Sequence, residues 1–179
     1  MKFAPCSWLG SLLLLFAVSA SAQLMPKSSL VLEVKPASQG SGAKVGARAF
    51  YFEQRNYVSG FVLDVSIRNM NKDPVKFDLE WYYTAKPMAG GRTFVFEHGS
   101  KPVELAGGAF FSEPLVSEVV EGSKVRGYFP RETGRKKDGW ILRIKENGVL
   151  TRWKASTPSL EAIGGDPAAL AALLKVPKK

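Results

Sequence analysis

The sequence predicts a mainly β protein, an antiparallel β-sandwich that ends in a short helical segment. Apolar and polar residues alternate with a period of two through most of the chain, and turn-forming residues interrupt that alternation at short intervals. The last 23 residues change to a helical pattern. A small β-barrel stays open as the alternative, because its strands would alternate in the same way.

Residues 1–22 have the pattern of a secretory signal peptide. Lys2 precedes an apolar run from Leu9 to Val18, and Ala20-Ser21-Ala22 supplies small residues for cleavage before Gln23. We therefore expect an exported protein of the periplasm, the cell envelope or the extracellular medium. We expect it to keep no membrane anchor once the segment is removed.

The predicted strands follow one another as a single domain, residues 23–156. Polar turns are expected at 69–74, 88–91 and 98–100, a Gly/Ser-rich break at 38–46, and a basic loop at 130–138. The strands expected from alternation are 30–35, 48–52, 57–69, 75–84, 93–97, 103–105, 109–111, 115–120, 124–129 and the two arms of a hairpin around Asn147-Gly148.

The C-terminal segment, residues 157–179, is expected to form short helices that pack on the same domain. Thr157-Pro158 reads as a helix N-cap followed by proline at the first helical position, and Asp166-Pro167 repeats the pattern. The apolar stripe of the second helix, expected to dock on the sheet, is Leu170, Leu173 and Leu174.

The stretch "FVLDVSIRNMNKDPVKFDLEWYYTA" resembles consecutive strands of an immunoglobulin-like sandwich in bacterial exported proteins. In that resemblance one strand ends at a polar turn, and the next carries a core tryptophan, here Trp81. The resemblance implies an immunoglobulin-like fold without the paired cysteines of antibody domains. It implies no function, since unrelated functions share this architecture.

The stretch "GWILRIKENGVLTRWKAS", residues 139–156, predicts a hairpin with a two-residue Asn-Gly turn. Counting outward from the turn places Arg143 opposite Arg152 and points Trp140 and Trp153 into the core, as Trp81 is expected to point. The other face would then be cationic, with Arg143, Lys145, Arg152 and Lys154.

This cationic face is the candidate site, because arginine forks bind carboxylate, sulfate or phosphate. The full chain has a formal net charge of +9, and Lys2 is the only charge in the signal segment. The expected partners are an acidic glycan, an anionic lipid surface or an acidic protein, and export argues against nucleic acid. The preceding loop would extend the face with Arg131, Arg135, Lys136 and Lys137.

Two interpretations of the cations that involve no binding function stay open. The charges can simply be solvated, because arginine stems cover apolar surface while their heads stay in water. Alternatively, acids on a neighbouring strand can neutralise them; Glu33, or Asp78 with Glu80, could do so.

Catalytic patterns are sparse. Cys6 is the only cysteine and lies in the signal segment, and His98 is the only histidine and falls in a predicted turn. We therefore expect a non-enzymatic binding or structural module without a cofactor or a metal. One alternative is carbohydrate binding by exposed Tyr51, Tyr57 and Tyr82. Another is a glycoside hydrolase, for which the available acids are Glu80, Glu97, Glu113 and Glu118.

Overall fold

The computed structural model describes residues 28–37, 42–49 and 52–175. The predicted signal peptide therefore lies outside the described residues. The elements, in chain order, are β1 (Leu30–Ala37), β2 (Gly42–Ala49), β3 (Phe52–Ser59), β4 (Val62–Asn69), β5 (Val75–Pro87), β6 (Phe94–Leu105), β7 (Phe110–Val116), β8 (Val120–Gly127), β9 (Arg131–Glu146), β10 (Val149–Ala155), α1 (Pro158–Gly165) and α2 (Pro167–Leu174).

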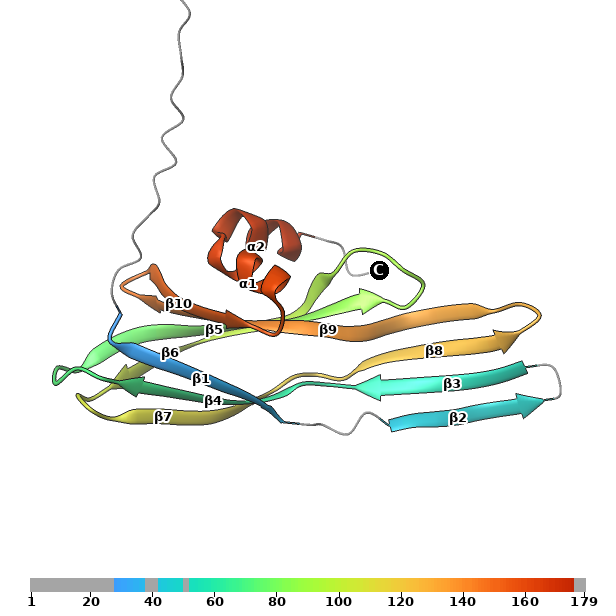
Figure 1. Cartoon of the computed structure of the whole chain (residues 1–179), viewed down its shortest axis with the longest axis horizontal. Helices are drawn as coiled ribbons and strands as arrows, with labels where there is room; N and C mark the ends of the chain where they lie inside the picture. The colour runs from blue at the N-terminus through green and yellow to red at the C-terminus, as the bar shows by residue number, and fades with distance from the viewer. Residues whose placement is uncertain (1–27, 38–41, 50–51, 176–179) are drawn as a thin grey trace, which may run out of the picture.

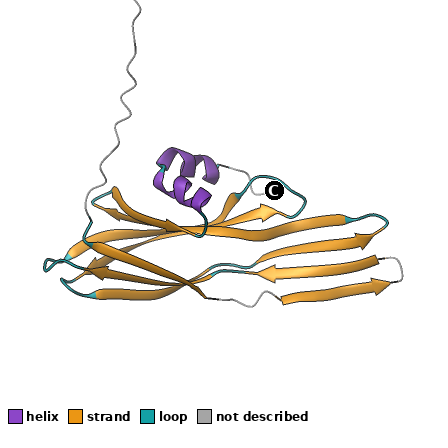
Figure 2. Cartoon of the chain, viewed as in Figure 1, coloured by secondary structure: helices purple, strands orange, loops and turns teal. Residues whose placement is uncertain are grey.

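The strands form two separate antiparallel sheets (Figures 1 and 2). The smaller sheet has the order β1-β4-β7, and the larger has the order β2-β3-β8-β9-β5-β6, with β10 also paired to β9. The prediction of a mainly β, sandwich-like protein with C-terminal helices is thereby confirmed. The alternative of a small closed barrel is wrong for the described residues.

The main core lies between the two sheets. Leu63, Val65 and Ile67 of β4 are fully buried against Leu79 of β5 and Leu142 of β9. Burying one such aliphatic side chain stabilises the fold by roughly 1.5–3 kcal/mol. Alternating apolar side chains thus explain why β4, β5 and β9 turn one face inward.

Strand β9 is sixteen residues long and extends past the sandwich. Its second half pairs with β10 on one edge, while residues 131–134 pair with β8. Strands β2, β3, β8 and the first half of β9 form an arm at one end of the long axis (Figure 1).

The two helices cover the outer face of the larger sheet (Figure 1). Thr157 caps α1 by accepting a hydrogen bond from the Leu160 amide, and Asp166 caps α2 in the same way. Leu160 and Leu170 are buried against Ile141 and Tyr82 in a second apolar cluster. Neither helix among the described residues is long and apolar enough to cross a membrane.

Several local predictions were wrong. The segment predicted as a turn at 98–100 lies within β6. Of the segment predicted as a basic loop at 130–138, all but Pro130 lies in the first half of β9. The predicted strand 57–69 is divided into β3 and β4. The Gly/Ser-rich break contains the start of β2, and its residues 38–41 lie outside the described ranges. In β2, β6 and β9 strand pairing outweighed local turn preference. Strands β3 and β4 are separate because the chain passes from the larger sheet to the smaller one between them.

Tyr83 and Tyr82 should make the protein sensitive to alkali. Burial raises the pKa of both phenols, and the nearby acids Glu97 and Glu80 add to the respective shifts. The folded state therefore keeps these protons after the unfolded chain has lost them. Stability is complete below the unfolded pKa of about 10 and falls as the pH rises above it towards the folded values.

We expect a late phase in an alkaline titration of tyrosinate absorbance. Tyr82→Phe and Tyr83→Phe should each remove part of this late phase, because each removes one of the two phenols whose pKa is raised. A wild-type titration without a late phase would contradict the burial argument. Tyr83→Phe also removes a hydrogen bond of 2.9 Å from its hydroxyl to the Leu115 carbonyl in the opposite sheet.

Candidate anion-binding surface

The hairpin turn forms as predicted, but its register changes two residues later. Asn147 and Gly148 have φ values of 52° and 77°, the left-handed conformation that a tight Asn-Gly turn requires. A bulge between Leu150 and Arg152 then adds one residue to β10. The prediction that Arg143 faces Arg152 is wrong for this reason.

Trp153 consequently lies on the helix side of the sheet. It pairs with Arg143, and its indole packs against Gly164 and Gly165 of α1. A Cβ atom added at Gly165 would lie 2.6 Å from the Trp153 Cζ2 atom, so the glycine permits this approach. Trp81 and Trp140 do pack in the main core, as predicted, but the inward orientation predicted for Trp153 is wrong.

Arg143 is enclosed and neutralised by Glu80. Their side chains are 5% and 13% exposed, with 3.5 Å between Arg143 Nη1 and Glu80 Oε2. Lys145 Nζ lies 2.5 Å from Glu80 Oε1, and the Tyr82 hydroxyl donates to Glu80 Oε2 at 3.0 Å. Glu80 is therefore the acid that faces these cations. Neither Arg143 nor Lys145 forms part of an open cationic face.

Arg152 and Lys154 are exposed but lie elsewhere. Arg152 donates from Nη2 to the Ser28 carbonyl at 3.1 Å, beside β1. Strand alternation places both side chains on the side of β10 opposite to Trp153. The four hairpin cations therefore do not form one surface, because the bulge separates Arg152 and Lys154 from Arg143 and Lys145.

The four cations predicted for the preceding loop lie on the first half of β9. We call them, together with Lys86, the β9 cationic segment: Lys86, Arg131, Arg135, Lys136 and Lys137. Lys86 of β5 stands directly opposite Lys136, a like-charge pairing that is unfavourable in a sheet. Within the described ranges, no carboxylate oxygen lies within 4.0 Å of the side-chain nitrogens of these five residues.

Aromatic rings accompany two of these cations. The Arg135 guanidinium lies 5.7 Å from the Phe94 ring centroid, and Lys137 Nζ lies 5.4 Å from that of Phe61. Lys137 Nζ also donates to the Gly60 carbonyl at 3.3 Å. These contacts orient the cations without neutralising them.

Glu132, the one acid within residues 131–137, forms its ion pair with a residue of another strand. Its carboxylate forms an ion pair with Lys124 of β8, directly across the sheet. The hydrogen bond from Lys124 lowers the pKa of Glu132, and the charges of Lys124 and Lys136 act in the same direction. Glu132 thus stays ionised but leaves the segment with excess positive charge.

A row of uncharged polar groups crosses the arm next to Arg131. Asn56, Ser123 and Thr133 stand opposite one another on β3, β8 and β9. Gln54 Nε2 donates to Asn56 Oδ1 at 3.1 Å and to Ser123 Oγ at 3.2 Å. Asn56, Ser123 and Thr133 also line a shallow hollow of about 570 Å³, together with Tyr57.

Sequence analysis missed this polar row. The usable signal was the composition of β3, "FEQRNYVS", in which polar residues occupy both alternating positions. Such a strand does not have a face that covers an apolar core. Its pairing with β8, however, is a long-range contact that periodicity does not reveal.

The alternative sites predicted from sequence are only partly available. Tyr82 is 9% exposed beneath the helices, so it cannot form a sugar-stacking platform; Tyr51 lies outside the described residues. Glu113 is paired with Lys101, and Glu97 accepts from the Glu118 amide at 2.6 Å. His98 lies on β6 beside the Tyr82 ring. No cluster of three potential metal ligands occurs in the described part of the chain.

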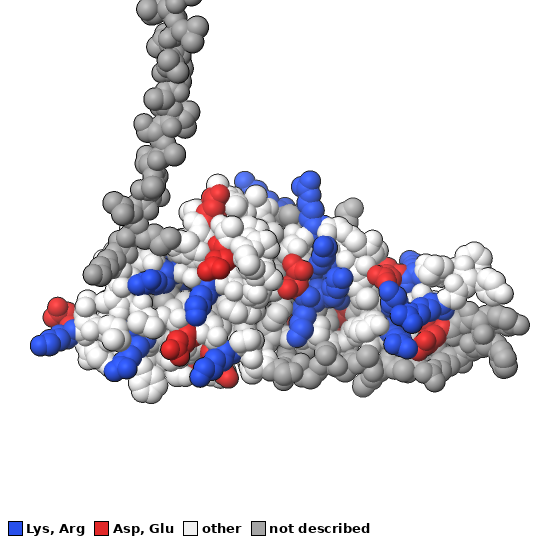
Figure 3. All heavy atoms as spheres, viewed as in Figure 1, with Lys and Arg blue, Asp and Glu red and all other residues white. Residues whose placement is uncertain are grey.

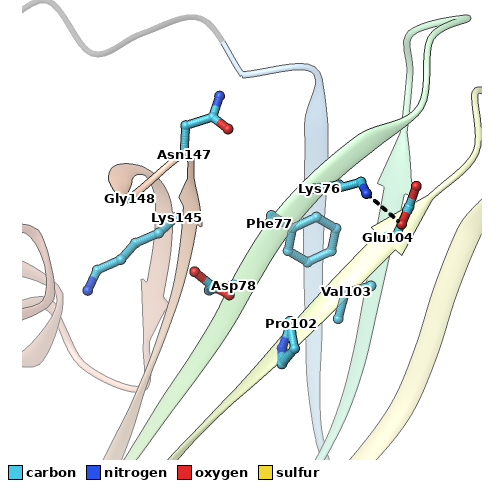
Figure 4. Close-up of a pocket in the computed structure, with 9 residues that line it drawn as sticks. All are labelled: Lys76, Phe77, Asp78, Pro102, Val103, Glu104, Lys145, Asn147 and Gly148. Atoms are coloured by element: carbon cyan, nitrogen blue, oxygen red, sulfur yellow. Dashed lines mark ion pairs between the residues drawn. The ribbon is translucent and has the colours of Figure 1, made fainter.

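A second hollow, of about 480 Å³, lies beside the Asn147-Gly148 turn (Figure 4). Its charges oppose one another: Lys76 pairs with Glu104 at 3.1 Å, and Asp78 stands opposite Lys145. An anion would therefore gain little here. In the space-filling view, the largest group of basic side chains lies over the middle of the molecule, beside the helices (Figure 3).

The fold and this surface define a two-layer antiparallel β protein with a cation-rich strand. The chain matches no protein-family model and no curated protein. A solved structure, Northeast Structural Genomics Consortium target SoR45, is similar with a TM-score of 0.29 and 11% identity, over 74% of this chain and 89% of that chain. A Bacteroides uniformis β-glucuronidase is similar with a TM-score of 0.24 and 9% identity, over 68% of this chain and 15% of that chain. Similarity at these levels supports no functional argument.

Proposed function

We propose that this protein is an exported, non-enzymatic binding module of the bacterial cell envelope that holds an acidic glycan along the β9 cationic segment. The observation that carries the proposal is the absence of any ion pair at Lys86, Arg131, Arg135, Lys136 and Lys137 among the described residues. Lys101, Lys124 and Lys145 are matched by acids. Arg152 and Lys154 of β10 also lack an ion pair among the described residues, but they lie outside this group of five. An external anion would supply the missing charge.

The shape of the segment favours a linear polymer over a small anion. From residue 131 to residue 137 an extended strand covers about 20 Å, at roughly 3.3 Å per residue. Strand alternation points Arg135 and Lys137, which lie over Phe94 and Phe61, to one face of the sheet and Lys136 with Lys86 to the other. Repeating carboxylates or sulfates can meet the charges along either face. The polar row beside Arg131 adds amide and hydroxyl groups, and Tyr57 adds a half-buried ring. Such groups suit sugar hydroxyls and the apolar faces of sugar rings.

We further propose that the sandwich is of the immunoglobulin-like kind. Its support is the strand order: β1-β4-β7 in one layer lies against β10-β9-β5-β6 in the other, and the chain changes layer between β4 and β5. The hairpin β2-β3 and strand β8 would then be additions that build the arm. This assignment concerns the scaffold and does not determine the ligand.

Retention on an immobilised acidic polysaccharide, measured across a salt series, tests the binding function. We expect retention at low salt that falls steeply as salt screens the charges. The variant Arg135→Gln, Lys136→Gln should lose about tenfold or more in affinity, because each charge-assisted hydrogen bond contributes roughly 1.5–3 kcal/mol.

The matched control is Lys76→Gln, Lys101→Gln. It removes the same formal charge from cations that already pair with Glu104 and Glu113. It should bind nearly as wild type does. Equal losses in the two variants would mean that net charge alone causes retention, and no retention of wild type would reject glycan binding.

A further inference from the structure

The turn between β8 and β9 presents two adjacent aromatic side chains to solvent. Phe129 is 89% exposed and Tyr128 is 81% exposed, more than any other large apolar side chain in the described ranges. We call residues 126–131 the β8–β9 tip: Arg126, Gly127, Tyr128, Phe129, Pro130 and Arg131. An isolated exposed aromatic residue is ordinary, but two neighbours at the end of a hairpin are not.

The β8–β9 tip lies at an extremity of the molecule. In Figure 1 it is at the opposite end of the long axis from the β4–β5 turn and the β9–β10 turn. A projecting point can reach a surface that the bulk of the sandwich does not touch. Within the described residues, Phe129 belongs to neither apolar cluster and makes no ring contact.

The charges around the aromatic pair are mainly positive. Arg126 and Arg131 flank it and are both exposed. Residues 121–137 contain six cations and two acids, and one of those acids, Glu132, is already paired with Lys124. The tip therefore complements a negatively charged surface.

We propose that the β8–β9 tip docks the protein on an anionic lipid bilayer. Phe129 inserts its apolar ring at the boundary between headgroups and acyl chains. Tyr128 lies at the level of the headgroups, where a ring with a polar hydroxyl is favoured. Arg126 and Arg131 remain at the level of the lipid phosphates, which attract them electrostatically. The position of the tip at one end of the long axis and its two flanking arginines support this occupant, because together they let the aromatic pair reach an extended anionic surface. The tip shares Arg131 with the β9 cationic segment, and its other residues lie outside that segment.

Sedimentation with lipid vesicles tests the docking. The protein is purified as the expressing cell exports it, so that wild type and variants share one N-terminus. We expect binding to vesicles of equal parts phosphatidylcholine and phosphatidylglycerol, and little binding to phosphatidylcholine alone. Tyr128→Ser, Phe129→Ser should weaken binding about tenfold or more. Arg126→Gln, Arg131→Gln should weaken it roughly 30-fold.

A matched control is Met70→Ser, Val149→Ser. Met70 follows β4 and Val149 begins β10, and both lie at the opposite end of the molecule. They are 60% and 54% exposed, and their loss should leave vesicle binding unchanged. Insertion is located with Phe129→Trp, whose emission should be quenched by brominated lipids, while Val149→Trp should not be quenched. Circular dichroism confirms that each variant is folded.

The proposal is overturned if the wild-type protein does not bind the mixed vesicles at low salt. Equal binding of wild type and the double serine variant also overturns it, because contact would then be made elsewhere. Loss of polysaccharide retention in the serine variant, without vesicle binding by wild type, would assign the tip to the glycan site. Failure of glycan binding itself is read separately, from the Arg135→Gln, Lys136→Gln variant.

Discussion

Glu80→Ala is expected to lower the free energy of unfolding by about 3 kcal/mol or more, the usual cost of removing one partner of a buried ion pair. Arg143, with a 5% exposed side chain, would keep its charge without a carboxylate beside it. Its Nε atom already has no hydrogen-bond partner among the described residues, so Glu80 provides the ion pair that compensates its buried charge. Lys145 and Tyr82 would lose their contacts to the same carboxylate.

Urea unfolding of three variants measures this effect. Glu104→Ala is the surface control: its pair with Lys76 joins side chains that are 60% and 76% exposed, and it should cost no more than about 1 kcal/mol. Glu80→Leu, Arg143→Met should recover most of the lost stability, because it removes both charges together. If Glu80→Ala were as stable as Glu104→Ala, the burial of Arg143 would have no energetic consequence.

Gly134→Ala is expected to detach part of the arm from β9, at a cost of at least about 2 kcal/mol. Gly134 has a φ of 81°, which side chains rarely adopt, and an added Cβ atom would lie 2.4 Å from the Glu121 carbonyl oxygen. That oxygen belongs to the backbone of β8, so only movement of the strand relieves the clash. Hydrogen exchange should accelerate in residues 120–134, while amides of the buried β4–β5 core keep their protection.

Gly148→Ala separates the conformational cost of a positive φ from the clash with β8. Its φ is 77°, nearly that of Gly134, but an added Cβ atom would have nothing within 4 Å. It should therefore show only the conformational cost, about 1 kcal/mol, with no change in the arm. Identical behaviour of the two alanine variants would mean that the contact with β8 does not hold the arm in place. Loss of vesicle binding in Gly134→Ala alone would link arm position to the β8–β9 tip.

Local sequence signals predicted the scaffold well where side chains and turns act over a few residues. The alternation in β5 places Phe77, Leu79 and Tyr83 in the core, and the caps Thr157 and Asp166 begin α1 and α2 as expected. The Asn147-Gly148 turn also follows from local preference, since both residues adopt positive φ. These elements need no knowledge of distant partners.

The sequence predicted only part of the candidate site. Arg131, Arg135, Lys136 and Lys137 were predicted as a basic group, but their strand conformation depends on pairing with β5 and β8. The polar row could not be predicted, because it joins β3, β8 and β9 across more than 60 positions of the chain. Arg152, Trp153 and Lys154 were predicted on the wrong faces of β10, because a bulge leaves no periodic signal.

The sequence by itself determined the alternation, the turn chemistry, the helix caps and the excess of positive charge, all of which follow from residue types and short spacings. Tertiary structure alone decided which cations are neutralised. Glu80 reaches Arg143 and Lys145 across β5 and β9, and Lys124 reaches Glu132 across β8 and β9, while Lys86 and Lys136 meet without an acid. Charge compensation depends on distances of a few ångströms between strands, and strand register sets those distances.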